Sequence, residues 1–474
     1  MSLRENISRI GNKESRIFLW IIILSALLVR ALWMGDYLKT DAFPFTKDSD
    51  GQAFFWKAQD IVEGDLFRKD LNTTWPFYVY FLAGLLKLFS GNLLRVILIQ
   101  QLLGVANCVL IYLIGRKLFS DTAGFIAGMI CVSCSSFLFY ESMLMYTSLS
   151  VFLVSLLFLL MLDLPDTFSL RRFLYAGIIF GIAVLTQANA LIFGFPAIVW
   201  VLWRKKESLV KAARYFFVFL AGFLLIIAAQ IIRDSIAHGT ATLGPRNLGV
   251  NFFIGNNPKA NGMMFCPQDF ANSQKGISRD AKAIARGTLG RDLNDSEVSM
   301  FWAAKGADFI FHDTKAYFKL ICRKMKAMFS GEQFAEEHEW RFLGSKIRFR
   351  MFDSMRWILP FAVMGMVMSL RMFQRVFLLF LVVVVFVFQM VLFYVMAKYR
   401  LTLIPFLAIF SGYGIAVFLE ALTRKRYMIL CLFCIAGWRI SFFGSRSFRG
   451  KRIRSGGIES VAGSRTPHAT GRLS

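Results

Sequence analysis

The stretch VFLLFLVVVVFVFQMVLFYVMA, residues 376–397, decides the fold class, because none of its 22 residues carries a charged side chain. As an α-helix, a segment of this length extends about 33 Å, enough to cross the roughly 30 Å hydrocarbon core of a bilayer. Apolar runs of similar character recur between residues 17 and 421. The pattern predicts an all-α polytopic membrane protein.

The overall composition favours the same class. Of the 474 residues, 56% are hydrophobic and 18% are charged, whereas about 25% of the residues in soluble domains are charged. The 55 Lys and Arg exceed the 30 Asp and Glu, which gives a net charge of +25. In a membrane protein such an excess gathers in cytoplasmic loops. An anionic lipid substrate is the alternative explanation, and we do not predict nucleic acid as a partner.

Ten apolar runs are candidates for membrane helices, and we expect them at about 17–34, 95–115, 122–139, 147–162, 173–186, 190–203, 215–232, 355–370, 376–397 and 401–421. The run at 76–90 is short for a crossing. A crossing there would place Arg171, Arg172 and later basic clusters outside, against the positive-inside rule. We therefore predict that this run is interfacial or re-entrant. With a short run at 428–438, the bundle has about 10–11 transmembrane helices.

Charge and hydropathy divide the chain into five parts. They are a cytoplasmic N-terminus at 1–16, an N-terminal membrane module at 17–232 that includes an outer loop at 35–94, an outer region at 233–354, C-terminal membrane helices at 355–444, and a basic tail at 445–474. The tail is rich in Ser, Gly and Arg, a composition typical of disorder. Within the outer region, residues 298–328 are expected to form one amphipathic helix.

The first outer loop has the strongest concentration of acidic side chains. Asp48 and Asp50 stand directly before a stretch in which Phe54, Ala58 and Ile61 recur at helical spacing. This spacing predicts a short helix along the membrane surface. A carboxylate at that surface can act as a general base toward an acceptor hydroxyl or amine. Ordinary solvation of exposed acids is the alternative interpretation.

Further candidates lie on the same predicted face. Glu141 falls in a short outer loop at about 140–146 and is a candidate second acidic group, which would assist catalysis or bind a metal. Arg95, Lys398 and Arg400 stand at outer helix ends, where cations suit a phosphate or pyrophosphate. Snorkelling of each cation to the interface is the simpler alternative.

Other chemistries find no support in the sequence. The four His residues are His238, His312, His338 and His468, and they have no metal-ligand spacing. The C-x-x-C pairs at Cys131 and Cys431 lie in apolar runs, where cysteines act as small apolar fillers. We therefore predict no metal site and no certain cofactor, with a divalent metal as the alternative. Nucleotide-binding glycine motifs are absent from the sequence.

The stretch from residue 48 to residue 65 resembles the first outer loop of the GT-C membrane glycosyltransferases. It is most similar to the bacterial branch of the dolichyl-phosphate-mannose protein mannosyltransferase family and to the aminoarabinose lipid A transferases. Their pattern is an Asp, an aromatic residue about four positions later, an Ala at eight, and then Gly-Asp. Asp50 and Ala58 fit this spacing, and Gly64-Asp65 follows.

Later motifs resemble the same group in the same order. They are Trp75-Pro76, Arg95 at a helix start, Gly255-Asn256-Asn257-Pro258, and Lys398-Tyr399-Arg400 followed by Pro405. Two departures stand out: the acidic pair of the family is often Asp-Glu but is Asp-Ser-Asp here, and the eukaryotic His-Pro-Pro step is Trp-Pro. The second departure makes a eukaryotic protein mannosyltransferase a poorer match.

The resemblance implies a GT-C-like bundle with interfacial helices in the first outer loop, and a glycosyltransferase that takes a hexosyl or pentosyl group from a polyprenyl-phosphate sugar. Asp50 would be the catalytic base, with Asp48 in reserve. Arg95, Lys398 and Arg400 would bind the donor phosphate. Asn256, Asn257 and Tyr399 would contact the acceptor or order the loop.

The expected location is a bacterial plasma (inner) membrane, with the site facing the periplasm or exterior and membrane lipids as partners. The acceptor is a protein, a lipid or a glycan. A transporter or flippase is the main alternative, but transporters place charges at mid-membrane, and the predicted helix centres here contain few acids. A polysaccharide polymerase acting on a lipid-linked sugar is the second alternative.

Overall fold

The computed structural model describes residues 13–40, 43, 49–68, 76–167, 169–203, 209–238, 247–264, 270, 274–330, 347 and 354–425. Within these ranges the secondary structure is helical, apart from one isolated bridge between Met263 and Val395. The predicted all-α polytopic membrane fold is confirmed. Asp48, Trp75 and the basic tail lie outside the described residues.

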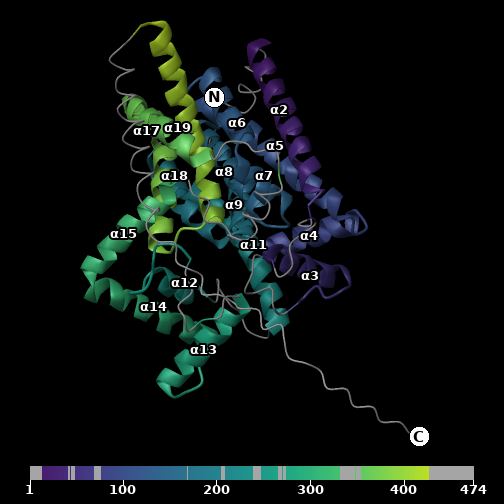
Figure 1. Ribbon diagram of the computed structural model, residues 1–474, viewed down its shortest axis with the longest axis vertical. Helices are drawn as coiled ribbons and strands as arrows, with labels where there is room; N and C mark the ends of the chain where they lie inside the picture. Colours follow the sequence, from purple (N-terminus) through teal and green to yellow (C-terminus); the bar gives the residue numbers. More distant parts are fainter. Residues whose placement is uncertain are drawn as a thin grey trace, which may run out of the picture.

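Each of the ten predicted membrane segments coincides with a helix or a helix pair. The bundle contains α2 (Lys13–Tyr37), α5 (Leu93–Leu118), α6 (Asp121–Val132), α7 (Ser135–Ser142), α8 (Thr147–Thr167), α9 (Leu170–Thr186), η2 (Ala188–Phe193), α10 (Gly194–Trp203), α11 (Leu209–His238), α17 (Ser354–Ser369), η3 (Leu370–Met372), α18 (Phe373–Leu392) and α19 (Ala397–Thr423). They are labelled in Figure 1.

Fewer of these helices are long enough to cross a membrane than the sequence predicted. Among the described residues, six apolar stretches meet that length, or seven if the pair α6 and α7, bent by 52°, counts as one span. The predicted number was 10–11. The difference arises because several predicted spans are short or run into one another: α9 has 17 residues, and α17, η3 and α18 form one apolar stretch at Trp357–Leu392.

Close helix contacts at glycines build the centre of the bundle. Gly115 on α5 faces Gly124 on α6, and Gly412 on α19 lies against the backbone of α6. Nearby, the rings of Phe119 and Tyr413 stack with their centroids 4.1 Å apart. At the periphery, by contrast, α11 buries only 11% of its apolar window. Such an exposed apolar face is expected of a helix that contacts lipid.

The basic loops lie together at one end of the bundle. Arg116 pairs with Asp121 at 3.0 Å, Lys117 pairs with Asp163, and the Arg375 guanidinium donates to the Lys117 carbonyl. These residues come from the junctions α5–α6, α8–α9 and η3–α18. The distribution of Lys and Arg in the sequence had placed these three junctions on the same side of the membrane, and the structure has them at the same end of the bundle.

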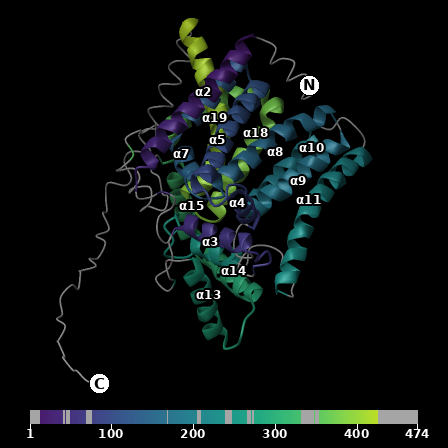
Figure 2. The same cartoon turned by 90° about the vertical axis from the view of Figure 1, so that its right-hand side faces the viewer.

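The polar segments gather at the opposite end of the bundle. They form α3 (Asp50–Val62), α4 (Pro76–Leu88), α12 (Leu248–Gly255), α13 (Gln274–Leu289), α14 (Asp295–His312) and α15 (Thr314–Phe329). Figures 1 and 2 show α3, α13 and α14 below most of the membrane helices, beside the lower end of the long helix α11, with α4 next to α3. Because α4 both follows α3 and precedes α5 at this end, it does not cross the bundle.

The amphipathic helix predicted at 298–328 is two helices. Asp313 separates α14 from α15, and its carboxylate accepts a hydrogen bond from the Ala316 N–H at 3.0 Å. An Asp in this position caps a new helix. The single-helix prediction was wrong because the apolar periodicity continues across the break.

Candidate functional site

Asp50 and Lys398 form an ion pair at the polar end of the bundle. The distance from Lys398 Nζ to Asp50 Oδ2 is 3.1 Å, and the side chains are 9% and 37% exposed respectively. Asp50 is the first residue of α3, and the Ser49 hydroxyl caps this helix by accepting from the Gln52 N–H. Lys398 is in the first turn of α19. Two of the predicted site residues, 348 positions apart, therefore lie in direct contact.

The electrostatics of the pair favour an ionised carboxylate. Lys398 lowers the pKa of Asp50 below its usual value, although burial acts in the opposite direction. Lys57, two turns further along α3, lowers the pKa in the same sense and is itself buried. Lys57 was not among the residues predicted from the sequence. Its spacing of seven residues from Asp50 indicated that the two side chains share a face of the amphipathic helix.

Aromatic contacts fix the helix that carries Asp50. The ring of Phe54, one turn after Asp50, meets Tyr78 of α4 edge-on at 5.2 Å and Tyr146 at 6.0 Å. Phe54 is 3% exposed and both tyrosines are buried. Because edge-to-face geometry is directional, these contacts hold the orientation of α3 as well as its position.

Glu141 is placed differently from its prediction. It belongs to α7, not to a solvated outer loop, and is 3% exposed. Its two carboxylate oxygens accept from Arg30 Nε and a terminal nitrogen of Arg30, both at 2.8 Å. Glu141 therefore forms an ion pair between helices α7 and α2, instead of being the expected acid at the membrane interface. Because Gly104 on α5 has no side chain, it leaves the space that the Glu141 carboxylate occupies.

A hydrogen-bond network connects this ion pair to the aromatic contacts. The side-chain amide of Gln100 donates to the carbonyls of Glu141 and Met143, at 3.2 and 2.7 Å, and its oxygen accepts from the Tyr78 hydroxyl at 2.7 Å. Tyr78 in turn contacts Phe54. The chain of contacts therefore extends from the bundle interior to the helix that begins with Asp50.

The Gly-Asn-Asn-Pro segment supports the other half of the site. The Asn256 side-chain amide donates to the Leu392 carbonyl at 2.7 Å, and its oxygen accepts from Lys324 Nζ at 2.9 Å. Lys324 also donates to the Val391 carbonyl at 2.8 Å. The Asn257 side-chain amide donates locally, to the Phe253 and Ile254 carbonyls of α12, which ends two residues before it. These contacts fasten the turn between α18 and α19, which presents Lys398.

Two other predicted residues, Tyr399 and Arg400, are also in the first turn of α19. Arg400 is buried and donates to the carbonyls of Ala327, Met328 and Ser330, at 3.0–3.4 Å, so it joins α19 to the end of α15. The ring of Tyr399 lies 6.0 Å from that of Tyr394.

Arg95 stands further out. Its side chain is exposed at the start of α5, and among the described residues it has no side-chain partner.

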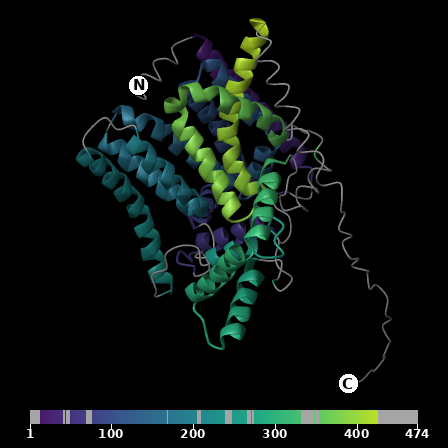
Figure 3. The ribbon, with the colours of Figure 1, turned by 90° about the vertical axis from the view of Figure 1, so that its left-hand side faces the viewer.

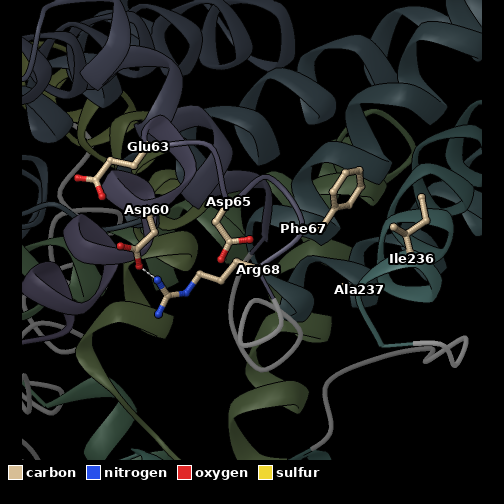
Figure 4. Close-up of a pocket in the computed structure, with 7 residues that line it drawn as sticks. All are labelled: Asp60, Glu63, Asp65, Phe67, Arg68, Ile236 and Ala237. Atoms are coloured by element: carbon tan, nitrogen blue, oxygen red, sulfur yellow. Dashed lines mark ion pairs between the residues drawn. The ribbon is translucent and has the colours of Figure 1, made fainter.

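An open cleft of about 830 Å³ lies beside the site, between the end of α3 and the end of α11. Its lining residues, drawn in Figure 4, are Asp60, Glu63, Asp65, Phe67, Arg68, Ile236 and Ala237. Arg68 pairs with Asp60. Ten helical residues separate Asp60 from Asp50, a distance of about 15 Å, so the cleft does not contain the ion pair.

A metal site is not evident in the described part of the chain, where no three His, Cys, Asp or Glu side chains lie close enough to share an ion. Cys131, Cys134 and Cys108 are buried there. The arrangement offers a carboxylate in contact with one ammonium group and near a second, at the polar end of the bundle. It can bind an anion and accept a proton.

Comparison with known proteins adds a match to a family model over part of the chain and a similarity of fold. Residues 73–232 match the model of the family described as dolichyl-phosphate-mannose-protein mannosyltransferase. A comparison with curated protein sequences gives no match.

Solved structures give a similarity of fold. The oligosaccharyltransferase of Archaeoglobus fulgidus in its apo form aligns with a TM-score of 0.51 and 14% identity, over 92% of this chain and 56% of that one. The archaeal oligosaccharyltransferase AglB from the same organism, in complex with an inhibitory peptide and a dolichol-phosphate, aligns with a TM-score of 0.49 and 14% identity over the same shares. The chain thus spans little more than half the length of the structures that it matches. The predicted resemblance to the GT-C superfamily of membrane glycosyltransferases is confirmed.

Proposed function

We propose that the protein is an integral membrane glycosyltransferase that moves a sugar from a polyprenyl-phosphate donor to a protein, lipid or glycan acceptor. The contact of Asp50 with Lys398 at the polar end of the bundle carries the proposal. The match to the mannosyltransferase family model and the oligosaccharyltransferase fold support it. The dolichol-phosphate bound in the archaeal structure is an example of the donor's lipid class.

The chemistry assigns opposite tasks to the two charges. An acceptor hydroxyl attacks the anomeric carbon, the bond from that carbon to the phosphate oxygen breaks, and the lipid phosphate leaves with the electron pair. Asp50 takes the acceptor proton as general base. Lys398 and Lys57 stabilise the negative charge that develops on the leaving phosphate. Attack from the side opposite to the phosphate inverts the anomeric centre.

Donor binding would also change the pKa of Asp50. In the free protein Lys398 lowers the pKa of Asp50, which weakens it as a proton acceptor. A donor phosphate that draws Lys398 toward itself removes much of that effect, while the partial burial of Asp50 remains. The pKa of Asp50 then rises toward the range in which a carboxylate accepts a proton more readily.

Of the three cations that the sequence predicted as phosphate ligands, the structure favours Lys398. Arg400 is already engaged with the carbonyls at the end of α15, and Arg95 is exposed at the start of α5. We propose that Lys398 makes the direct contact with the phosphate and that Arg400 holds the first turn of α19 in place. The site would face the side of the membrane where α3 and α12–α15 gather, the periplasm in a bacterium.

The test is a donor assay with the full-length protein reconstituted in lipid. Radiolabelled sugars on polyprenyl phosphate are offered in parallel with nucleotide sugars, and a membrane extract supplies the acceptor. The proposal predicts that label leaves only the polyprenyl-phosphate donors and appears in the acceptor fraction. Movement of an intact labelled lipid across the bilayer, with no transfer in any acceptor fraction, would instead identify a transporter.

A further inference from the structure

The outward face of α15 is a basic, aromatic surface that no other part of the described structure covers. Between Thr314 and Ser330 the chain has five Lys or Arg residues and no Asp or Glu. Four of these cations are exposed together with one aromatic ring and a thiol. The exposed residues of this face are Lys315, Phe318, Lys319, Cys322, Arg323 and Lys326.

The spacing of these residues puts them on one side of the helix. Steps of three and four positions bring side chains onto a common face. The opposite side carries Leu320, Lys324, Ala327 and Met328, all buried against the protein. The ring of Phe318 on the outward face is strongly exposed, at 66%, and so is that of Phe311 in the last turn of α14, at 79%.

Carboxylates of the described residues do not neutralise this face. In the part of the chain that the structure describes, none of Lys315, Lys319, Arg323 and Lys326 has an ion-pair partner. The acids that precede α15 are engaged elsewhere: Asp313 caps this helix and Asp308 pairs with His312 at 2.9 Å.

Contacts at the C-terminal end of α15 place it at the level where the membrane helices end. Lys324 Nζ donates to the Val391 carbonyl in the last turn of α18. Arg400, in the first turn of α19, donates to the Ser330 carbonyl just after α15 ends. Figures 1 and 3 show α15 at the edge of the bundle, next to α18 and outside the ring of membrane helices.

We propose that this face docks on the anionic phospholipid headgroups of the leaflet that surrounds the polar end of the bundle. A helix with cations and large apolar side chains on the same exposed face suits the boundary between headgroups and acyl chains. There Phe318 enters the apolar zone, joined by Phe311 from the end of α14, and the four cations of α15 meet lipid phosphates. The outer segment is then held to the bilayer at α15, and so is the turn that presents Lys398.

Cys322 provides a reporter in the middle of the face. It is exposed, whereas Cys108, Cys131 and Cys134 are buried. The full chain, with Cys266, Cys431 and Cys434 changed to Ser, is labelled at Cys322 with a fluorophore and reconstituted in lipid. Lipids brominated near the headgroup then quench the fluorophore only where the face touches the bilayer.

The proposal predicts strong quenching in phosphatidylcholine mixed with phosphatidylglycerol and weak quenching in phosphatidylcholine alone. The triple variant Lys315→Gln, Lys319→Gln, Arg323→Gln should lose this difference. Three cations at an anionic surface change the docked population by on the order of 100-fold. Because these side chains are exposed, the variant is expected to fold normally, which its melting temperature checks.

A charge-matched control comes from the neighbouring α13 region. Changing Arg279, Arg286 and Arg291 to Gln removes the same charge from exposed positions elsewhere in the outer segment, and it should leave quenching unchanged. Equal quenching in both lipid mixtures, no quenching in either, or equal effects of the two triple variants would each overturn the proposal.

Discussion

The buried ion pair between Arg30 and Glu141 allows a quantitative test of how the bundle is held together. The change is Arg30→Met, which keeps an unbranched apolar side chain in α2 and leaves the Glu141 carboxylate without its partner. Both side chains are nearly inaccessible, with 3% and 4% of their surface exposed. Solvent therefore screens the interaction weakly.

The structure sets the size of the effect. Two charge-assisted hydrogen bonds of 2.8 Å are lost together, and removal of one partner from such a buried pair costs about 3–5 kcal/mol of unfolding free energy. The double variant Arg30→Met, Glu141→Met removes both charges, and it should be more stable than either single variant. The energies of the singles will therefore not add.

The assay is equilibrium unfolding of the purified protein in mixed micelles, followed by circular dichroism. An exposed Arg–Glu pair serves as the control: Arg424 and Glu420 are 3.1 Å apart, with side chains 60% and 54% exposed. Arg424→Met should cost no more than about 0.5 kcal/mol. If Arg30→Met costs as little as Arg424→Met, or if the energies of the Arg30 and Glu141 variants simply add, the reasoning is refuted.

A glycine variant disturbs the same pair without removing a charge. A methyl group at Gly104 would overlap the Glu141 carboxylate, whereas one at Gly84 in α4 would meet open space. Gly104→Ala should therefore destabilise the protein, and Gly84→Ala should not. In a background that already contains Glu141→Met, the cost of Gly104→Ala should shrink. A constant cost in both backgrounds would place the clash elsewhere.

Two further predictions concern pH. Lys398→Met removes the main cause of the low pKa of Asp50, so the acid limb of the transfer activity should move to higher pH; an unshifted limb in the residual activity would contradict the pairing. Burial lowers the pKa of Lys324 to about 7, whereas an unfolded Lys titrates near about 10.4. Between these pH values the unfolded state binds more protons, so stability should rise with pH, by on the order of 5 kcal/mol. Lys324→Met should flatten that rise in unfolding measurements, and an unchanged slope would show that Lys324 titrates normally.

Local patterns in the sequence predicted the helices and the start of α3. Phe54, Ala58 and Ile61 lie on one buried face, as their spacing indicated. The sequence also placed Asp50 and Lys398 at the same end of the bundle. Their contact could not be predicted, because it depends on how α3 and α19 pack, and no local pattern encodes that packing.

The error over Glu141 has a definite physical origin. Its neighbours suggested a short loop between two apolar runs, whereas the chain continues as helix α7, which is bent by 52° from α6. Arg30 was the overlooked signal: a charged residue inside a membrane segment is costly and usually has a partner within the protein. The contacts of Asn256 and Arg400 could not be predicted from local sequence either, because their side chains donate to carbonyls of distant elements.

The central claim is that Asp50 acts in sugar transfer, and a comparison of two Asp→Asn variants tests it most directly. Asp295 is the matched control, because it too begins a helix and pairs with a lysine, Lys282, at 3.2 Å. The measurement is the initial rate of sugar loss from a polyprenyl-phosphate donor by the full-length protein in lipid. Asp50→Asn should slow this rate by roughly 10²–10⁴-fold, and Asp295→Asn should leave it at the wild-type value. A folded Asp50→Asn protein that works as fast as the Asp295→Asn protein would contradict the account.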